Sequence, residues 1–212
     1  IVCGNSQIGN FVARYLADGS LDTSFGHLGV VFDILETRVK IISFDVQKDS
    51  KIIITGLYGY EMKNVTLRLN TNGQLDSTFG TNGTFIETYT VSTTPISVLT
   101  LSDNSVIVGS EIYYYPGAID RYKQLSLSKY VGAKKLSTKI ISLEGLEYIN
   151  EIRKTKENKI IVEFESNINQ FGNPVRTLAF VRFNADFTRD EEFNNGNILT
   201  TSLSPYNSDE ST

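Results

Sequence analysis

The chain repeats itself at an interval of 54 residues, and this constrains its fold more than any other feature. Residues 19–26 read Gly-Ser-Leu-Asp-Thr-Ser-Phe-Gly and return at 73–80 as Gly-Gln-Leu-Asp-Ser-Thr-Phe-Gly. The two aspartates, Asp22 and Asp76, mark the interval. A repeat of about this length with strand-like content is typical of β-propellers and other stacked β arrays.

A second element recurs at the same interval. A polar turn containing Asp49, Asp103 or Glu157 is followed each time by a short β-branched, apolar run. Such runs after a turn predict strands. Residues 1–4 fit as the end of this strand in an earlier copy.

The next strand of each copy carries a basic residue followed by a large apolar one, beginning at Arg14, Arg68, Lys129 and Arg182. A turn and the Leu-Asp-x-x-Phe-Gly stretch follow, and one more strand closes the unit. Each copy thus holds four strands, here called a to d, in up-and-down order. The closing strands are expected at residues 30–33, 84–87, 140–143 and 198–201.

Four such strands make one propeller blade. A β-sandwich needs no repeat of this kind, and solenoid coils are usually about 20–30 residues long. We therefore predict an all-β fold, a β-propeller of four-stranded antiparallel blades within one domain that is part of a longer protein. The expected blades are residues 1–34 (strands b to d), 35–90, 91–144 and 145–203, followed by a polar tail at 204–212.

Residues 11–26, Phe-Val-Ala-Arg-Tyr-Leu-Ala-Asp-Gly-Ser-Leu-Asp-Thr-Ser-Phe-Gly, resemble the delta-60 repeat of β-propeller proteins. The likeness is strong in the first two copies and partial in the fourth. In the third copy, residues 131–136 (Val-Gly-Ala-Lys-Lys-Leu) replace the turn. The resemblance implies a propeller in a large bacterial protein, extracellular or at the cell surface, and it implies no reaction.

Repeated residues are expected to serve the structure. A turn aspartate usually accepts hydrogen bonds from nearby backbone N–H groups, although cation binding by Asp22 and Asp76 beside Asp18 stays an alternative. An aromatic residue can fill the gap between blades, and glycine suits a positive φ. We expect no metal or cofactor, and the structural positions are Asp22, Asp76, Phe25, Phe79, Phe193, Gly26 and Gly80.

Ligand binding is expected where the copies differ. The loops between strands b and c are longer in the third and fourth copies and carry aromatic and amide side chains. Such groups suit sugars or peptides, because rings offer a flat apolar surface and amides offer paired hydrogen bonds. The alternative is that Tyr113 and Tyr115 pack down on the blade while Tyr114 points outward. The candidate ligand residues are Tyr58, Tyr60, Tyr113, Tyr114, Tyr115, Asn169, Phe171 and Asn173.

Composition excludes several classes of protein. The formal charge of −4 and the scattered basic residues argue against nucleic-acid binding. No apolar run is long enough to predict a membrane span, and a single cysteine, Cys3, allows no internal disulfide. The one histidine, His27, is expected at the surface, and no Gly-x-Ser-x-Gly motif accompanies it.

We therefore expect a non-enzymatic interaction, adhesion or scaffold module with a protein or glycan partner. One alternative is a carbohydrate- or peptide-binding site on the face of the b–c loops. A second is a propeller hydrolase or lyase that uses carboxylates and tyrosines. Because the first copy lacks strand a, the ring would be completed by a homodimer or by further blades in the same polypeptide.

Overall fold

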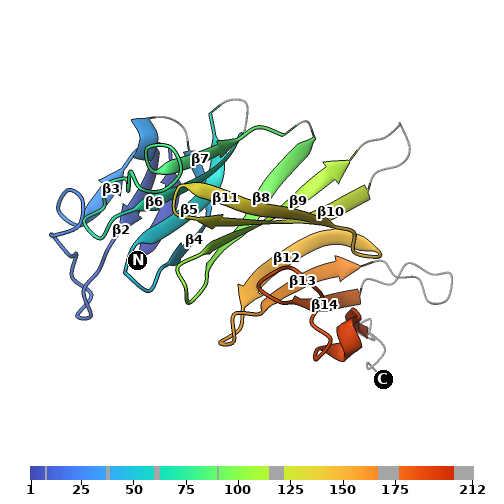
Figure 1. Cartoon of the computed structure of the whole chain (residues 1–212). Coiled ribbons are helices and arrows are strands. Elements are labelled where there is room, and N and C mark those ends of the chain that lie inside the picture. Colours follow the sequence, from blue (N-terminus) through green and yellow to red (C-terminus); the bar gives the residue numbers. More distant parts are fainter. Residues whose placement is uncertain are drawn as a thin grey trace, which may run out of the picture.

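The computed structural model describes residues 1–7, 9–36, 39–59, 63–89, 91–114, 122–166 and 177–202. Within them the chain forms four antiparallel sheets, here called blades 1 to 4 (Figure 1). Blade 1 contains β1 (Val2–Ser6), β2 (Gly9–Ala13) and β3 (Val30–Phe32), and blade 2 contains β4 (Val39–Val46), β5 (Ile52–Tyr58), β6 (Lys63–Leu69) and β7 (Thr84–Glu87). Blade 3 contains β8 (Ser92–Thr100), β9 (Val106–Tyr114), β10 (Tyr122–Val131) and β11 (Lys134–Ile141), and blade 4 contains β12 (Leu146–Lys154), β13 (Ile160–Ser166), β14 (Thr177–Phe183) and β15 (Leu199–Ser202). Two short 3₁₀ turns, Ile34–Glu36 and Asn194–Gly196, complete the secondary structure of these residues.

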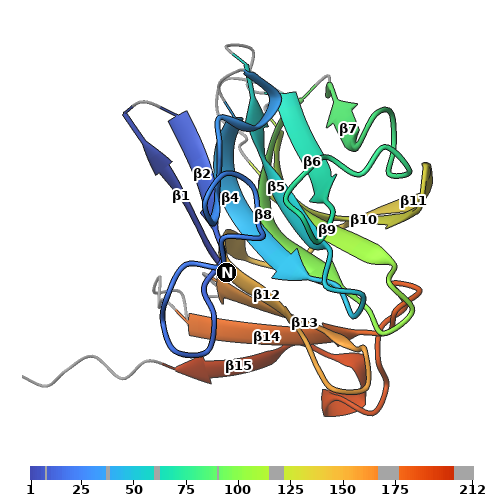
Figure 2. The ribbon, with the colours of Figure 1, turned by 90° about the vertical axis from the view of Figure 1, so that its left-hand side faces the viewer.

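Strands follow one another in chain order within each sheet, and the sheets succeed one another along an arc (Figures 1 and 2). Among the described residues, the extensive contacts between sheets run from each blade to the next, and no contact of that extent joins blade 4 to blade 1. The predicted β-propeller of four-stranded blades is confirmed. Blade 1 has three strands in the described residues, and the tail at 204–212 lies outside them.

The third copy departs from the prediction at its closing strand. β11 begins at Lys134 rather than near residue 140, because β10 and β11 are joined by a tight turn that pairs Val131 with Lys134. Gly132 provides the positive φ of 52° that this turn needs. Residues that form the Leu-Asp-x-x-Phe-Gly loop in the other copies therefore continue the strand here.

Apolar packing between blades forms the core. Ile53 and Phe79 of blade 2 are fully buried against Val106, Val108 and Tyr130 of blade 3. A corresponding cluster joins blades 1 and 2, and the largest joins blades 3 and 4. Each of the two inner sheets is thus covered on both faces.

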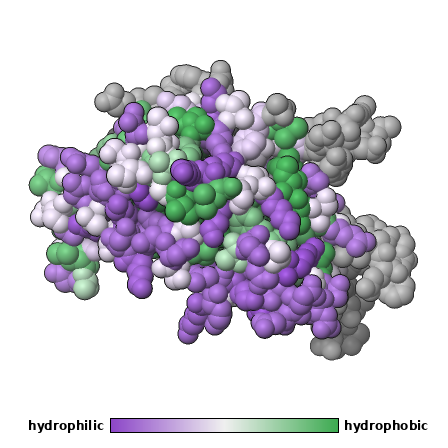
Figure 3. Space-filling model, in the orientation of Figure 1, coloured by the Kyte–Doolittle hydropathy of each residue, from purple (hydrophilic) through white to green (hydrophobic). Residues whose placement is uncertain are grey.

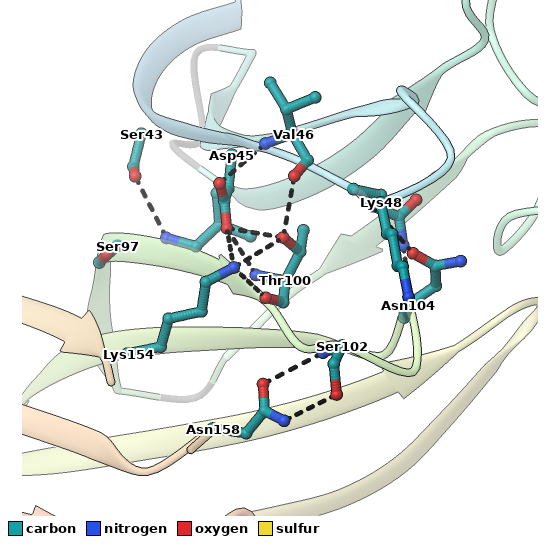
Figure 4. Close-up of polar contacts among 12 residues, drawn as sticks. Ser43, Asp45, Val46, Lys48, Ser97, Thr100, Ser102, Asn104, Lys154 and Asn158 are labelled. Atoms are coloured by element: carbon teal, nitrogen blue, oxygen red, sulfur yellow. Dashed lines mark hydrogen bonds and ion pairs between the residues drawn. The ribbon is translucent and has the colours of Figure 1, made fainter. Parts of the chain in front are cut away.

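Polar contacts between neighbouring first strands accompany this packing (Figure 4). Thr100 of β8 donates its backbone N–H to Asp45 of β4 at 2.7 Å, and Lys154 of β12 reaches the same carboxylate at 3.4 Å. The a–b turns are linked as well. The Asn104 Oδ1 accepts from the Lys48 N–H, and the Asn158 Oδ1 accepts from the N–H of Ser102, both at 3.1 Å.

Three copies share a motif of arginine, aspartate and phenylalanine. In blade 2 the Arg68 guanidinium lies 4.8 Å from the Phe79 ring centroid, and its Nε lies 2.7 Å from the Asp76 carboxylate. The Asp76 Oδ1 accepts from the backbone N–H of Thr78 at 3.1 Å. The same contacts join Arg14, Asp22 and Phe25 in blade 1, and Arg182, Asp190 and Phe193 in blade 4.

This motif accounts for the repeated aspartates. The predicted backbone bonds are present, and the arginine is a partner that the sequence analysis did not assign. Burial alone would raise the pKa of Asp76, but hydrogen bonds from Lys51 and Thr78 and the charge of Arg68 hold it well below its usual value. The carboxylate is therefore ionised and paired, which leaves the structural interpretation better supported than cation binding.

Phe193 is an exception among the repeated aromatics. Phe25 and Phe79 are fully buried between consecutive blades, whereas Phe193 of blade 4 is only half-buried. No described blade packs against that side of blade 4, so the expectation that Phe193 fills a gap between blades stays a prediction.

The backbone at Gly80 has a positive φ and leaves no room for a side chain. Its φ is +56°, and an added Cβ would lie 2.1 Å from the Thr84 carbonyl oxygen. Gly132 has a similar φ of +52°, but an added Cβ there meets nothing within 4 Å. We expect G132A to cost about 1–2 kcal/mol from backbone strain and G80A to cost about 1–3 kcal/mol more from the clash, measured by urea unfolding. Equal losses in both variants would contradict this account of the loop.

Candidate functional site

A pocket of about 430 Å³ lies at the end of blade 2, between the ends of β5 and β6 and the described residues that lead to blade 3. This is the face on which ligand binding was predicted. Leu57 and Lys63 come from the strands that flank the b–c loop, and Glu87 lies at the end of β7. The remaining lining residues are Asn64, Thr88, Tyr89, Val91, Ser92, Thr93 and Thr94.

Asn64 is the most unusual residue of this pocket. Its side chain lies in β6, opposite Glu87 of β7, and the residue is only 6% exposed. Among the described residues, neither its amide nitrogen nor its amide oxygen has a partner of normal hydrogen-bond geometry. The Tyr89 hydroxyl lies beside the amide, and its side-chain contact with Asn64 acts to lower the pKa of Tyr89. A buried amide without partners is unfavourable, so a ligand that satisfied it would gain a large part of its binding energy there.

Blade 1 carries an asparagine, Asn10, at the position that corresponds to Asn64. Asn10 lies four residues before Arg14, as Asn64 lies four residues before Arg68. The Asn10 Oδ1 accepts from the Ile34 N–H at 3.0 Å, so the connection to the next blade satisfies its oxygen. In blade 2 the Asn64 side chain instead lines the pocket.

A carboxylate cluster forms one side of the pocket and joins blades 2 and 3. Glu87 accepts hydrogen bonds from the Tyr89 hydroxyl at 2.6 Å, from the Tyr130 hydroxyl at 2.8 Å and from Lys135 at 2.5 Å. Tyr130 and Lys135 belong to β10 and β11. The extended β11 of the third copy is what brings Lys135 to this site.

Electrostatic interactions within the cluster determine the protonation states of its members. Burial tends to raise the pKa of Glu87, but the bonds from Lys135 and the two tyrosines lower it below its usual range. Burial, followed by the bonds and charge of Glu87, raises the pKa of Tyr89 and of Tyr130. Near neutral pH the glutamate is thus ionised and both phenols are protonated, so the cluster orders the pocket wall and no member is poised for proton transfer.

At the same end of blade 3, Lys123 lies beside two aromatic rings. The Lys123 Nζ lies 3.6 Å from the centroid of the Tyr148 ring and 5.0 Å from that of Tyr113, and it pairs with the buried Glu111 at 3.5 Å. Glu111 also accepts from the Ile149 N–H at 3.2 Å. Protein groups therefore already occupy the space between these aromatic rings.

The predicted ligand residues are not gathered into one site by the described structure. Tyr58 packs against the core between blades 1 and 2, and Tyr113 lies beside Lys123. Tyr114 ends β9, and its side chain is not described. The other candidates lie outside the described residues, namely Tyr60, Tyr115, Asn169, Phe171 and Asn173.

The remaining sequence candidates for chemistry lie apart. His27 is exposed in the turn after Gly26, and burial raises the pKa of the Cys3 thiol to about 12. Within the described ranges, no three His, Cys, Asp or Glu side chains gather as a metal site, and no helix is long and apolar enough to cross a membrane. The face shown in Figure 3 is mostly hydrophilic, with separate apolar patches.

These observations define the protein as a β-propeller with a pocket at the junction of two blades. The family model described as "Domain of unknown function (DUF5122) beta-propeller" matches residues 1–25 and 47–79. The matched segments belong to the first two copies and end at Phe25 and Phe79, so the chain is similar to a β-propeller family in those copies. No curated protein matches the chain.

The Glu87 cluster predicts an acid-sensitive contribution to stability. Because the folded-state pKa lies below the unfolded value of about 4.3, the cluster stabilises the fold above that value, and the stabilisation is lost as the pH falls through the folded pKa. We expect E87Q to be less stable at pH 7 and to lose less of its stability on acidification, measured by urea unfolding at a series of pH values.

The exposed Glu144 provides a matched control. E144Q should keep the wild-type acid dependence. Y130F, which removes one bond to Glu87, should cost about 1–2 kcal/mol at pH 7. An unchanged pH dependence in E87Q would contradict the assignment.

Proposed function

We propose that this propeller is a non-enzymatic interaction module that binds a protein or glycan partner at the blade 2 pocket. The observation that carries the proposal is the buried Asn64 amide, whose donor and acceptor atoms have no partner of normal hydrogen-bond geometry in the part of the chain that the structure describes. A natural sequence that retains such a group at a pocket accepts a cost in stability, which is common at functional sites.

The pocket chemistry favours a neutral polar group of the partner. An asparagine amide pairs with a group that offers an acceptor and a donor side by side, such as a peptide unit or two adjacent sugar hydroxyls. The pocket around the amide is also lined by the hydroxyl-bearing residues Ser92, Thr93 and Thr94 and by apolar Leu57 and Val91. The Glu87 carboxylate is already bonded three times, which reduces its attraction for a cationic ligand.

The hydrolase or lyase alternative has weaker support. A general acid requires a raised carboxyl pKa and a tyrosine base a lowered one, whereas Glu87 and its tyrosines are shifted the opposite way. We also propose a location for the protein. The likeness of residues 11–26 to the delta-60 repeat supports a role at the cell surface or in a secreted protein.

Substitution of Asn64 by leucine separates binding from folding. Copies three and four carry Leu125 and Leu178 at this position, so the repeat accommodates the side chain. We expect N64L to raise the stability by about 1 kcal/mol, because it removes an unsatisfied buried amide. We expect it to weaken ligand binding at least about tenfold.

Binding is measured by NMR titration with two sets of probes, methyl glycosides and N-acetyl dipeptide amides. N10L is the matched control, since the Asn10 Oδ1 already accepts a hydrogen bond from the Ile34 N–H. It should lower the stability and leave probe binding unchanged. Failure of every probe to bind the wild type, or equal binding by N64L, would overturn the proposal.

A further inference from the structure

The closing strand of blade 3, β11, has an outer edge with which no described strand pairs. The strand is eight residues long, whereas the closing strands of the other blades, β3, β7 and β15, have three or four residues. Blade 3 packs on blade 2 with one face and on blade 4 with the other, so this edge belongs to no interface between the described blades (Figure 2). A short edge strand limits unwanted strand pairing, and β11 lacks that protection.

A regular stretch of β11 lies open to pairing. Residues 137–141 pair one by one with residues 125–129 of β10, and Leu136 bulges out between this stretch and Lys135. Every residue of β11 except Ile141 is exposed. Leu136 and Ile140 are 56% and 57% exposed, so the edge presents apolar side chains as well as backbone groups. A strand laid along β11 would engage both.

The hairpin of β10 and β11 is basic within an acidic chain. Residues 122–143 contain five lysines and no aspartate or glutamate, although the whole chain has 24 acidic residues and a formal charge of −4. Two of these lysines, Lys123 and Lys135, form ion pairs with Glu111 and Glu87. The hairpin thus differs in charge from the rest of the protein.

The other three lysines lie on one face of the hairpin. Their cross-strand pairs are Lys129 with Ser137, Lys134 with Val131 and Lys139 with Leu127. Alternate residues of β10 point to the same side, and so do their direct partners on β11. The Lys139 Nζ donates to the Phe187 carbonyl at 3.0 Å, but none of the three forms an ion pair within the described ranges. The open edge therefore carries three positive charges that no described carboxylate contacts.

We propose that the outer edge of β11 binds an extended acidic segment of a partner protein, which adds a strand to blade 3. Backbone groups of residues 137–141 pair with the segment, and Ile140 packs against one of its apolar side chains. Lys129, Lys134 and Lys139 attract its carboxylates. A second copy fits poorly, because two such edges would bring like charges together. The proposal does not depend on the Asn64 pocket, which other residues line.

The probe is an acetylated, fluorescently labelled peptide of alternating glutamate and valine, as long as β11, with binding followed by fluorescence anisotropy. The wild type should bind it, and added salt should weaken the complex. The same peptide with lysine in place of glutamate should not bind.

Charge variants locate the binding surface. We expect K134E to weaken binding of the acidic peptide by about threefold to tenfold. K156E makes the same charge change in the exposed a–b turn of blade 4 and should bind as tightly as the wild type. N64L, which alters the pocket, should also leave peptide binding unchanged.

Hydrogen exchange distinguishes strand pairing from attraction between side chains. An edge strand leaves alternate backbone N–H groups open to water, so the peptide should slow exchange within residues 137–141 at least about tenfold. The amides of β3 serve as an internal reference and should keep their exchange rates. The proposal fails if the wild type does not bind the acidic peptide, or if the basic peptide binds equally well. It fails too if K156E or N64L weakens binding as much as K134E, or if binding leaves exchange at 137–141 unchanged.

Discussion

Burial of each sheet by the next blade is the constraint on which this structure depends. A single four-stranded sheet has two faces and can cover neither by itself, so each blade becomes stable only when a neighbour contributes the other half of a core. Ile53 and Ile107 show this directly, because each is completely excluded from water by residues of the following blade. The polar links from Asp45 to Thr100 and from Asn158 to Ser102 then fix how consecutive blades align.

The proposed binding site lies where the copies stop being equivalent. The loss of the Leu-Asp-x-x-Phe-Gly loop in the third copy lets β11 begin at Lys134, and this brings Lys135 to Glu87 of blade 2. At the same junction Asn64 lines a pocket, and its amide has no partner of normal hydrogen-bond geometry among the described residues. The two departures from the repeat, the extended β11 and the pocket beside Asn64, thus lie at the same junction of blades 2 and 3. A strictly symmetric propeller would have neither.

Much of the fold could be predicted from the sequence, because strand order, turn chemistry and the repeat interval all point to the same unit. The site could not. Asn64 was passed over, since its partners and its burial depend on a connection whose course no local pattern encodes. Its one available signal was an asparagine at the position where the later copies carry Leu125 and Leu178. The long b–c loop and its aromatic residues make Tyr113 a candidate, but they do not reveal that Lys123 lies beside its ring.

The regular spacing of contacts has a consequence for how the chain reaches this structure. Strands pair with their immediate neighbours in sequence, and the bonds between first strands and a–b turns of consecutive blades span 54 to 57 residues. No step of assembly within these contacts requires the two distant ends of the chain to find each other first. Folding can therefore begin at any pair of blades and spread outward one hairpin at a time, so a nascent chain can add finished blades in the order in which they are synthesised.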